Sequence, residues 1–312
     1  MKKKINSLTI IILLALIIIY VFTNSKNITT AIFESYELFL KNIFPSLFPM
    51  FIISYILVEI KIPEVLGNIF KKPFYKLFKT RKEASFVFFM SMLTGFPSSA
   101  KYIESLMNKN LIDEKDANKI LQFTFFSNPL FIINTVGIMF LNNIKLGYII
   151  LISHITGNII TGLIFRNYNK KEELKEENIR QSIRELIIKI NTTKFFNVLL
   201  NAIKDALSTM ILIFGILVTF QIIITMMPKS TIIKGLIEMT IGLKYTSLLT
   251  NTNLKLILST FFLSFGGLCI HTQIMNILNK KRVKYLPFLL ARIIHGITSS
   301  IIAITITLIW GA

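Results

Sequence analysis

The strongest constraint on this chain is an apolar stretch, residues 89–102 (FMSMLTGFPSSAKY), that a glycine, a proline, two serines and a lysine interrupt. In lipid every backbone N–H and C=O group needs a hydrogen-bond partner, so irregular backbone at membrane depth persists only where protein or a water-filled cavity surrounds it. Residues 258–274 (LSTFFLSFGGLCIHTQI) show the same pattern, because two glycines interrupt an apolar run and polar side chains follow. Paired interruptions in two halves of a membrane protein point to a binding site. We therefore expect ligand-facing irregular backbone around Gly95 and Gly266.

Composition places the chain in a membrane. Of its 312 residues, 53% are hydrophobic and 16% are charged, and the mean hydropathy is +0.64. A chain this apolar is expected to be an all-α, polytopic membrane protein whose surroundings are the lipid bilayer. The net charge of +19 comes from Lys and Arg in short stretches between apolar segments. That is the positive-inside pattern rather than a nucleic-acid footprint, so no nucleic-acid partner is expected.

The residues that usually carry enzyme chemistry are sparse. The chain has one cysteine, Cys269, and three histidines without the spacing of zinc ligands. No pairing of a nucleophile with a base is visible. We therefore expect neither a metal nor another cofactor, and we expect that the chain is not an enzyme.

The N-terminal segment combines a basic start with a long apolar run at residues 5–22, and no small-residue cleavage site follows it. It is expected to be a transmembrane helix with Lys2, Lys3 and Lys4 in the cytoplasm and residues 23–37 as a short external loop. Residues 61–83 carry basic and aromatic side chains at helical spacing, which predicts an amphipathic helix at the cytoplasmic interface. Spans, some of them interrupted, are predicted at residues 38–60, 120–141, 147–166, 201–227, 254–278 and 287–310.

The order of these segments predicts two related halves. Residues 95–97 (GFP) align with residues 265–267 (FGG), and the polar interruption at residues 127–129 aligns near residues 294–296. The two halves would insert in the membrane with opposite orientation if the Gly95 segment is a re-entrant hairpin. For each broken segment, the sequence is compatible with either a re-entrant hairpin or a full membrane span. The expected organisation is an extra N-terminal transmembrane helix (1–30), a first repeat (31–166), a charged cytoplasmic linker (167–195) and a second repeat (196–312).

Six motifs follow one another along the chain: FPSLFP at 44–49, GFPSSAK at 95–101, SNPLF at 127–131, EMTIG at 238–242, FGGL at 265–268 and PFLLARIIH at 287–295. Together they resemble the sporulation integral membrane protein YlbJ family, whose members carry the gate repeat shared with concentrative nucleoside transporters. The resemblance implies two gate-type repeats and a role in moving dipicolinic acid across the outer forespore membrane. Three positions depart from the family, which usually has glycine at Ser99, serine at Cys269 and glutamine at His271.

The breaks suggest how an anion would be bound. An interrupted helix presents the free N–H groups and the positive dipole end of its second half. We expect Ser98 and Ser99 to cap that end and Lys101 and Arg292 to meet carboxylates, although both cations can instead snorkel to an interface. His154 with Asn158 is more typical of a hydrogen bond between helices than of a ligand site. The predicted substrate-binding residues are Gly95, Pro97, Ser98, Ser99, Lys101, Asn128, Gly266, Gly267, His271, Gln273, Arg292 and His295.

These expectations combine into a function. The chain is predicted to be a permease that carries a small anionic aromatic metabolite by alternating access, and the family resemblance names dipicolinic acid. A coupling ion, H⁺ or Na⁺, and a homo-oligomer are compatible with this prediction. Two alternatives stay open: a carrier of nucleosides or other small solutes with the same fold, and a structural membrane protein of the spore envelope that transports nothing.

Overall fold

The computed structural model describes residues 7–169, 179–278 and 283–310, and every regular element within these ranges is a helix. The all-α prediction is therefore confirmed. Lys2–Lys4, the centre of the charged linker and the basic residues 280–282 lie outside the described residues. The elements are α1 (Ser7–Thr23), α2 (Ser25–Leu38), η1 (Phe39–Ile43), α3 (Phe44–Glu59), α4 (Ile62–Phe78), α5 (Ala84–Thr94), α6 (Ser98–Asn108), α7 (Glu114–Ile120), η2 (Phe131–Phe140), α8 (Ile144–Ile164), η3 (Phe165–Asn167), α9 (Ile179–Thr192), α10 (Phe195–Thr225), α11 (Thr231–Ile237), α12 (Met239–Thr246), α13 (Thr252–Phe265), α14 (Gly267–Ile277) and α15 (Tyr285–Trp310).

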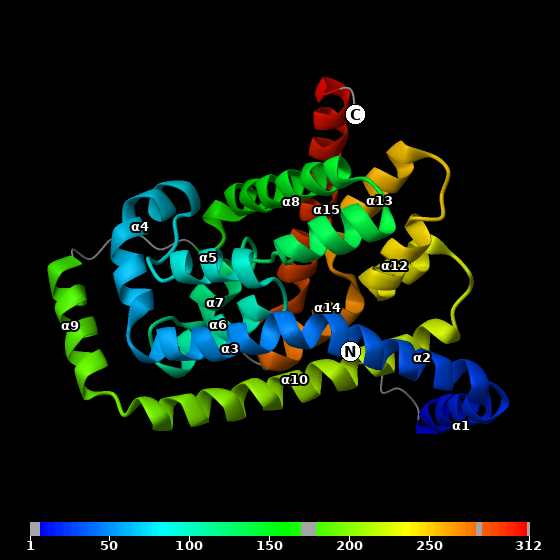
Figure 1. Cartoon of the computed structure of the whole chain (residues 1–312), viewed down its shortest axis with the longest axis horizontal. Coiled ribbons are helices and arrows are strands. Elements are labelled where there is room, and N and C mark those ends of the chain that lie inside the picture. The colour runs from blue at the N-terminus through cyan, green and yellow to red at the C-terminus, as the bar shows by residue number, and fades with distance from the viewer. Residues whose placement is uncertain (1–6, 170–178, 279–282, 311–312) are drawn as a thin grey trace.

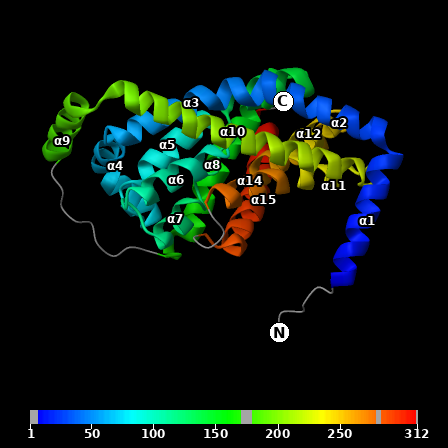
Figure 2. The ribbon, with the colours of Figure 1, turned by 90° about the horizontal axis from the view of Figure 1, so that it is seen from below.

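Several helices are long and apolar enough to cross a bilayer. Among the described residues they are α8 with η3, α10, α13 joined to α14, and α15. A fifth crossing is present if α1 and α2, which meet at an angle of 89°, form one broken span. Figure 2 shows α1 standing away from the rest of the chain at this bend. The chain is thus a multi-pass membrane protein, as its composition predicts.

The region before α4 differs from its prediction. The external loop expected at residues 23–37 is instead mostly helix α2 (Ser25–Leu38), whose residues Ile28, Ala31 and Ser35 fall on one helical face and are buried. The span expected at residues 38–60 is divided by the π-helical turn η1, and its apolar part is Leu47–Glu59. At 1.5 Å per residue this part is ~20 Å long, which is shorter than the ~30 Å hydrocarbon core.

The span expected at residues 120–141 does break at its predicted polar interruption, residues 127–129, but the part before the break is not a membrane helix. Helix α7 ends at Ile120, residues 124–128 (named the extended segment below) have no regular secondary structure, and the π-helix η2 begins at Phe131. Residues 124–127 of this segment are buried, so their backbone polar groups need partners inside the protein. Other predicted helices agree with the structure: α4 covers the predicted amphipathic stretch, and α8, α10 and α15 cover the spans predicted at 147–166, 201–227 and 287–310.

The two breaks have different shapes. At Gly95 the chain turns back, because the ring of Phe86 on α5 packs 5.9 Å from the ring of Tyr102 on α6, and the Tyr102 hydroxyl donates to Thr94 Oγ1. Each of these helices has 11 residues, about half a membrane thickness, so the segment is a helical hairpin. At Gly266, by contrast, α13 and α14 follow each other as one 26-residue apolar element, which is long enough for a full span. The inverted duplication itself remains a prediction.

The helices enclose two apolar cores. Figure 1 shows α8 and α10 on opposite sides with the α5–α6 hairpin between them, and α15 packs against both α8 and α13. The larger core gathers around the hairpin, the extended segment and α15. The smaller core joins η1 and α3 to α10, and it includes Cys269 of α14. Leu47 and Leu217 of the smaller core and Phe96 and Ile270 of the larger one line a common cavity, so that cavity lies at the seam between the cores.

Candidate functional site

A cavity of about 380 Å³ opens where the two broken segments meet. Residues from both halves line it: Thr94, Phe96 and Pro97 come from the first break, and Cys269, Ile270 and Gln273 come from the helix that follows the second. Apolar side chains from η1, η2 and α10 complete most of the wall. The polar side chains in the lining are Lys41, Thr94, Ser127, Asn128, Asn134, Thr135, Glu238, Thr240 and Gln273.

The first break is shaped by Gly95. Its φ is +81°, and a Cβ placed on it would lie 2.5 Å from the backbone nitrogen of Asn128. Only glycine therefore lets the hairpin tip approach the extended segment this closely. The contact brings Asn128 to the cavity, where its Nδ2 donates to Thr94 O at 3.3 Å and its Oδ1 accepts from Leu130 N at 2.8 Å.

The second break uses two glycines with positive φ. A Cβ on Gly266 (φ +87°) would lie 2.3 Å from Cζ of Phe125, and one on Gly267 (φ +69°) would lie 3.0 Å from Met239 N. The Phe125 ring also stacks on the Phe96 ring at 4.7 Å. Phe125 thus connects the two breaks, one on each side of its ring.

Two helices start at the cavity without a side chain that caps them: α6 after Pro97 and α14 after Gly266. The expected capping role of Ser98 is wrong, because its hydroxyl donates to the carbonyl of Gly95 instead. Ser99 Oγ is buried and has no hydrogen-bond partner among the described residues. Pro97 before α6 and Cys269 in the first turn of α14 line the cavity, so both helices begin beside it with their positive dipole ends, although Ser98 N and Ala100 N already donate to the carbonyls of Gly95 and Pro97.

Gln273 and Glu238 are deeply buried polar groups of the lining, each 2% exposed. Gln273 Nε2 contacts Cys269 Sγ at 3.5 Å, whereas its Oε1 has no partner in the described part of the chain. Glu238 caps α12: its two oxygens accept from Thr240 N at 3.1 Å and Ile241 N at 2.8 Å. The cavity therefore holds one acidic side chain, and its one basic side chain, Lys41, pairs with Glu37 at the exposed rim.

Arg292 lies outside the cavity lining, in the core beside it. It is fully buried, its guanidinium lies 4.5 Å from the Phe125 ring centroid and 5.5 Å from that of Phe288, and it donates to the carbonyl of Gln122. A second nitrogen lies 3.0 Å from His295 Nδ1. Since a buried Arg costs a few kcal/mol, of order +2.5 to +3.5, these contacts must offset its burial.

Arg292 belongs to a set of side chains that satisfy the extended segment. Ser127 N donates to His154 Nε2 at 2.9 Å, and Asn158 Nδ2 donates to Phe125 O at 3.0 Å. His154 Nδ1 also contacts Ser264 Oγ at 2.9 Å, and His295 Nε2 contacts the His154 carbonyl at 2.8 Å. These side chains therefore replace helical hydrogen bonds at the carbonyls of Gln122 and Phe125 and at the N–H group of Ser127.

The other predicted site residues are also placed away from the cavity. Lys101 forms ion pairs with Glu104 at 3.1 Å and with Asp205 of α10 at 2.9 Å, and therefore connects the hairpin to the second half. His271 faces Phe265 O at 2.8 Å and the Tyr285 hydroxyl at 3.2 Å. The residues that do reach the lining from the predicted set are Pro97, Asn128 and Gln273, while Gly95, Gly266 and Gly267 shape its wall.

Comparison with known proteins adds a relative. The chain is 26% identical to the sporulation integral membrane protein YlbJ of Bacillus subtilis (strain 168), in an alignment of 308 residues that covers 86% of this chain and 74% of that protein. The predicted family resemblance is confirmed. The chain is a homologue of YlbJ, and hence of a sporulation membrane protein. No family model and no solved structure matches the chain.

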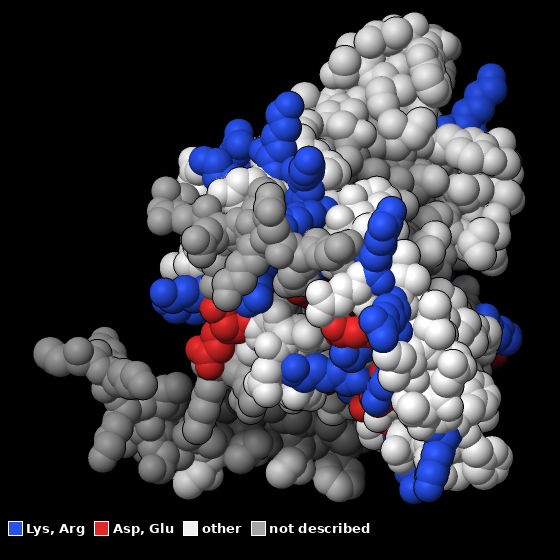
Figure 3. All heavy atoms as spheres, turned by 90° about the vertical axis from the view of Figure 1, so that its left-hand side faces the viewer, with Lys and Arg blue, Asp and Glu red and all other residues white. Residues whose placement is uncertain are grey.

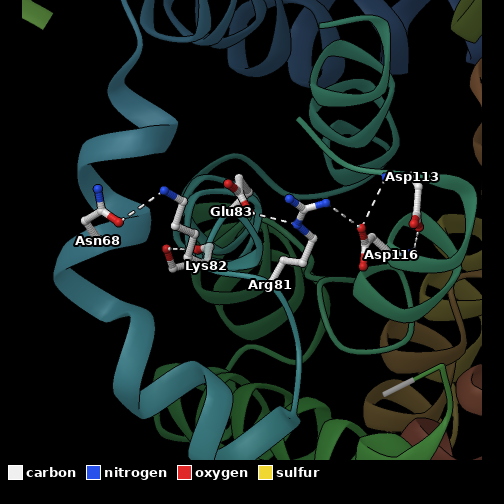
Figure 4. Close-up of polar contacts among 7 residues, drawn as sticks. Asn68, Arg81, Lys82, Glu83, Asp113 and Asp116 are labelled. Carbon is white, nitrogen blue, oxygen red and sulfur yellow. Dashed lines mark hydrogen bonds and ion pairs between the residues drawn. The ribbon is translucent and has the colours of Figure 1, made fainter. Parts of the chain in front are cut away.

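The end of this YlbJ homologue that carries α4 and α9 is rich in charge. Figure 3 shows Lys and Arg side chains spread over this face with fewer acidic ones among them. Figure 4 shows Arg81 between the buried carboxylates of Glu83 (3.6 Å) and Asp116 (3.4 Å), while Lys82 reaches Asn68 at 3.1 Å. These contacts anchor the turn before α5, and the excess of basic residues suits the predicted cytoplasmic side.

Glu238 is the main polar lining residue that the sequence-based site omits. The sequence does carry a signal for it, since EMTIG places a lone acid immediately before a helix start in an apolar stretch of this YlbJ homologue. The predicted site also omits Asn134 and Thr135, for a different reason. They follow the polar interruption in the span predicted at residues 120–141, and their position in a π-helix, which shifts the facing side chains, cannot be predicted from a helical period of 3.6 residues.

Proposed function

We propose that the chain is a membrane carrier for a small anionic aromatic metabolite, with dipicolinic acid moved across the outer forespore membrane as its substrate. The observation that supports this proposal is the cavity between the two breaks. Its volume of about 380 Å³ lies within the ~300–1,000 Å³ that small-molecule sites occupy. Its wall is mostly apolar with a few polar groups, which is the usual composition of such sites.

Three features of the cavity support the substrate class. The uncapped starts of α6 and α14 favour negative charge. The Phe96 and Phe131 rings in the lining suit a flat ring. Asn128 offers an amide that can orient a ligand, and the sporulation name of the YlbJ relative fits a metabolite of the spore.

Reconstitution tests the proposal. The purified full-length protein is placed in liposomes, and uptake of radiolabelled dipicolinate is measured under gradients of H⁺ and of Na⁺. We expect uptake above that of protein-free liposomes, and we expect unlabelled dipicolinate to compete. No dipicolinate flux under any gradient, with a folded protein, would contradict the proposal and favour a structural role in the spore envelope.

A matched pair of variants ties the flux to the cavity. Ile213 of α10 is 1% exposed and lines the cavity, whereas Ile211 on the same helix is 70% exposed. Ile213→Trp should fill the cavity and reduce uptake at least tenfold, and Ile211→Trp should leave uptake near that of the wild type. Equal effects of the two substitutions would mean that the cavity is not the transport site.

One observation favours a second substrate class. The lining offers amides and a carboxylate, namely Asn128, Asn134, Gln273 and Glu238, which could hydrogen-bond a nucleobase and a ribose. The same liposomes therefore also receive labelled uridine and adenosine. Nucleoside uptake without dipicolinate uptake would replace the anion with a nucleoside and leave the carrier proposal in place.

A further inference from the structure

The acidic side chain in the cavity conflicts with an anionic ligand. Glu238 lies in the lining at 2% exposure, and no Lys, Arg or His forms an ion pair with it among the described residues. An ionised Glu238 would repel a dicarboxylate held in the same low-dielectric space. The anion and the carboxylate therefore need a positive species between them, or the carboxylate must lose its charge.

The position of Glu238 allows it to become neutral without disrupting the fold. Its oxygens accept the N–H groups of Thr240 and Ile241. Each carboxyl oxygen has two lone pairs, so adding a proton to one oxygen leaves both capping hydrogen bonds possible. The new O–H group would then be a donor for a ligand carboxylate, whereas the ionised form can only accept.

The start of α14 holds Glu238 at the centre of the site. A Cβ on Gly267 would lie 3.3 Å from Glu238 Cα, so the second break packs directly on this residue. Cys269 and Gln273, which follow on α14, line the same cavity as Glu238. A change in the charge of Glu238 therefore acts where the break, the helix end and the cavity meet.

We propose that Glu238 takes up one proton when the cavity binds its anionic ligand, so that the carrier moves proton and anion together. When the ligand enters, hydronium or a buffer acid in the solution on that side gives up a proton, and one O–H bond forms on Glu238; when the ligand leaves on the other side, that O–H bond breaks and the proton passes to water there. This inference rests on the proposed function, because it requires that the ligand be an anion.

Few other titratable groups face Glu238. On α14 the Cys269 thiol interacts with it, and His271 faces Phe265 and Tyr285 instead. On α11, Lys234 Nζ lies 3.8 Å from the Tyr245 ring centroid of α12. The π-helix η2 has no titratable side chain. Lys41 of η1 lines the same cavity and pairs with Glu37 at the exposed rim. On the other packed helices, Lys204 and Asp205 lie about two turns before the cavity-lining Ile213 of α10, Lys244 lies about one turn after the cavity-lining Thr240 of α12, and Lys255 lies about three turns before Gly266 at the end of α13.

The test measures dipicolinate binding to the full-length protein between pH 6 and 8 by titration calorimetry. In this range an ordinary dicarboxylate stays ionised, so a change in affinity reports on the protein. We expect the dissociation constant to rise toward tenfold per pH unit above the pKa of Glu238. Titrations in buffers of different ionisation enthalpy should show the uptake of about one proton per ligand, consistent with that slope. This measurement needs no variant.

Two variants locate the proton. Glu238→Gln keeps one capping acceptor and is always neutral, so its affinity should be the same at pH 6 and pH 8, without proton uptake. Glu64→Gln, which removes a half-buried carboxylate from α4 outside the cavity, should keep the wild-type pH dependence.

Each outcome has a consequence. Binding that is independent of pH in the wild type, or equally pH-dependent in Glu238→Gln, would overturn the inference and leave the proposed function standing. Binding that requires Na⁺ and no proton would overturn it in favour of a sodium ion. If the wild type binds no dipicolinate at any pH, the proposed function fails and the inference fails with it.

Discussion

The substitution Gly95→Ala tests the geometry on which the site depends. Gly95 has φ +81° and ψ 174°, a backbone region that is essentially restricted to glycine, and forcing another residue into it costs about 1–3 kcal/mol. The added methyl group would also lie 2.5 Å from Asn128 N and 2.9 Å from Asn128 Cβ. Neither is the end of a flexible side chain, so relieving the clash moves backbone and adds about 1–3 kcal/mol. The expected loss of stability is therefore about 2–6 kcal/mol.

Gly215→Ala is the matched control. Gly215 lies inside α10, and a Cβ on it would meet no atom within 4 Å. Alanine there should be neutral or stabilise the helix by up to about 1 kcal/mol. The melting temperatures of the two variants are compared in detergent, where the fraction of protein that stays monodisperse is measured after heating to a series of temperatures. Similar melting temperatures for Gly95→Ala and Gly215→Ala would refute the argument that the hairpin tip packs on Asn128.

Two further substitutions separate structural cations from ligand-binding ones. Arg292→Lys should reduce the free energy of unfolding by about 1–3 kcal/mol, because an ammonium group cannot both donate to Gln122 O and stack between two rings. The variant should keep its preference for dipicolinate over uridine in the liposome assay. Loss of that preference would mean that Arg292 binds the ligand. Asp205→Lys should lower the melting temperature, because it places a like charge beside Lys101 of the hairpin. The double variant Lys101→Asp with Asp205→Lys should recover part of this loss. No recovery in its melting temperature would show that the 2.9 Å ion pair does not hold the two halves together.

The sequence predicts the location of the site better than its residues. Breaks at Gly95 and Gly266 could be predicted, because adjacent glycines, or a glycine followed by proline and serines, disfavour a continuous helix within an apolar run. The choice between hairpin and span at each break could not, since it depends on contacts such as the one between Phe86 and Tyr102. The roles of Ser98, Lys101 and Arg292 could not be predicted either, because their partners are distant in sequence or belong to the backbone.

A polar residue in an apolar segment has two possible causes, and the sequence does not distinguish them. It can face a ligand, as Asn128 and Gln273 face the cavity, or it can replace a missing backbone hydrogen bond, as His154 and Asn158 do. Both causes appear together here for a physical reason. A chain that unwinds to form a cavity leaves backbone groups unpaired, and these groups must be satisfied by side chains from neighbouring helices.

Because side chains near the cavity are used to satisfy unpaired backbone groups, only a few groups at the cavity itself determine its charge. Arg292 is committed to the backbone of the extended segment and Lys101 to Asp205, so neither predicted cation neutralises the cavity's ligand directly. What remains are the dipole ends of α6 and α14, each equivalent to about half a positive charge, and the carboxylate of Glu238. Two half charges roughly balance one carboxylate, and they exceed it only when that carboxylate is protonated. In the proposed mechanism a single proton controls the affinity of the cavity for an anion, and the pH dependence of Glu238→Gln is the measurement that tests it.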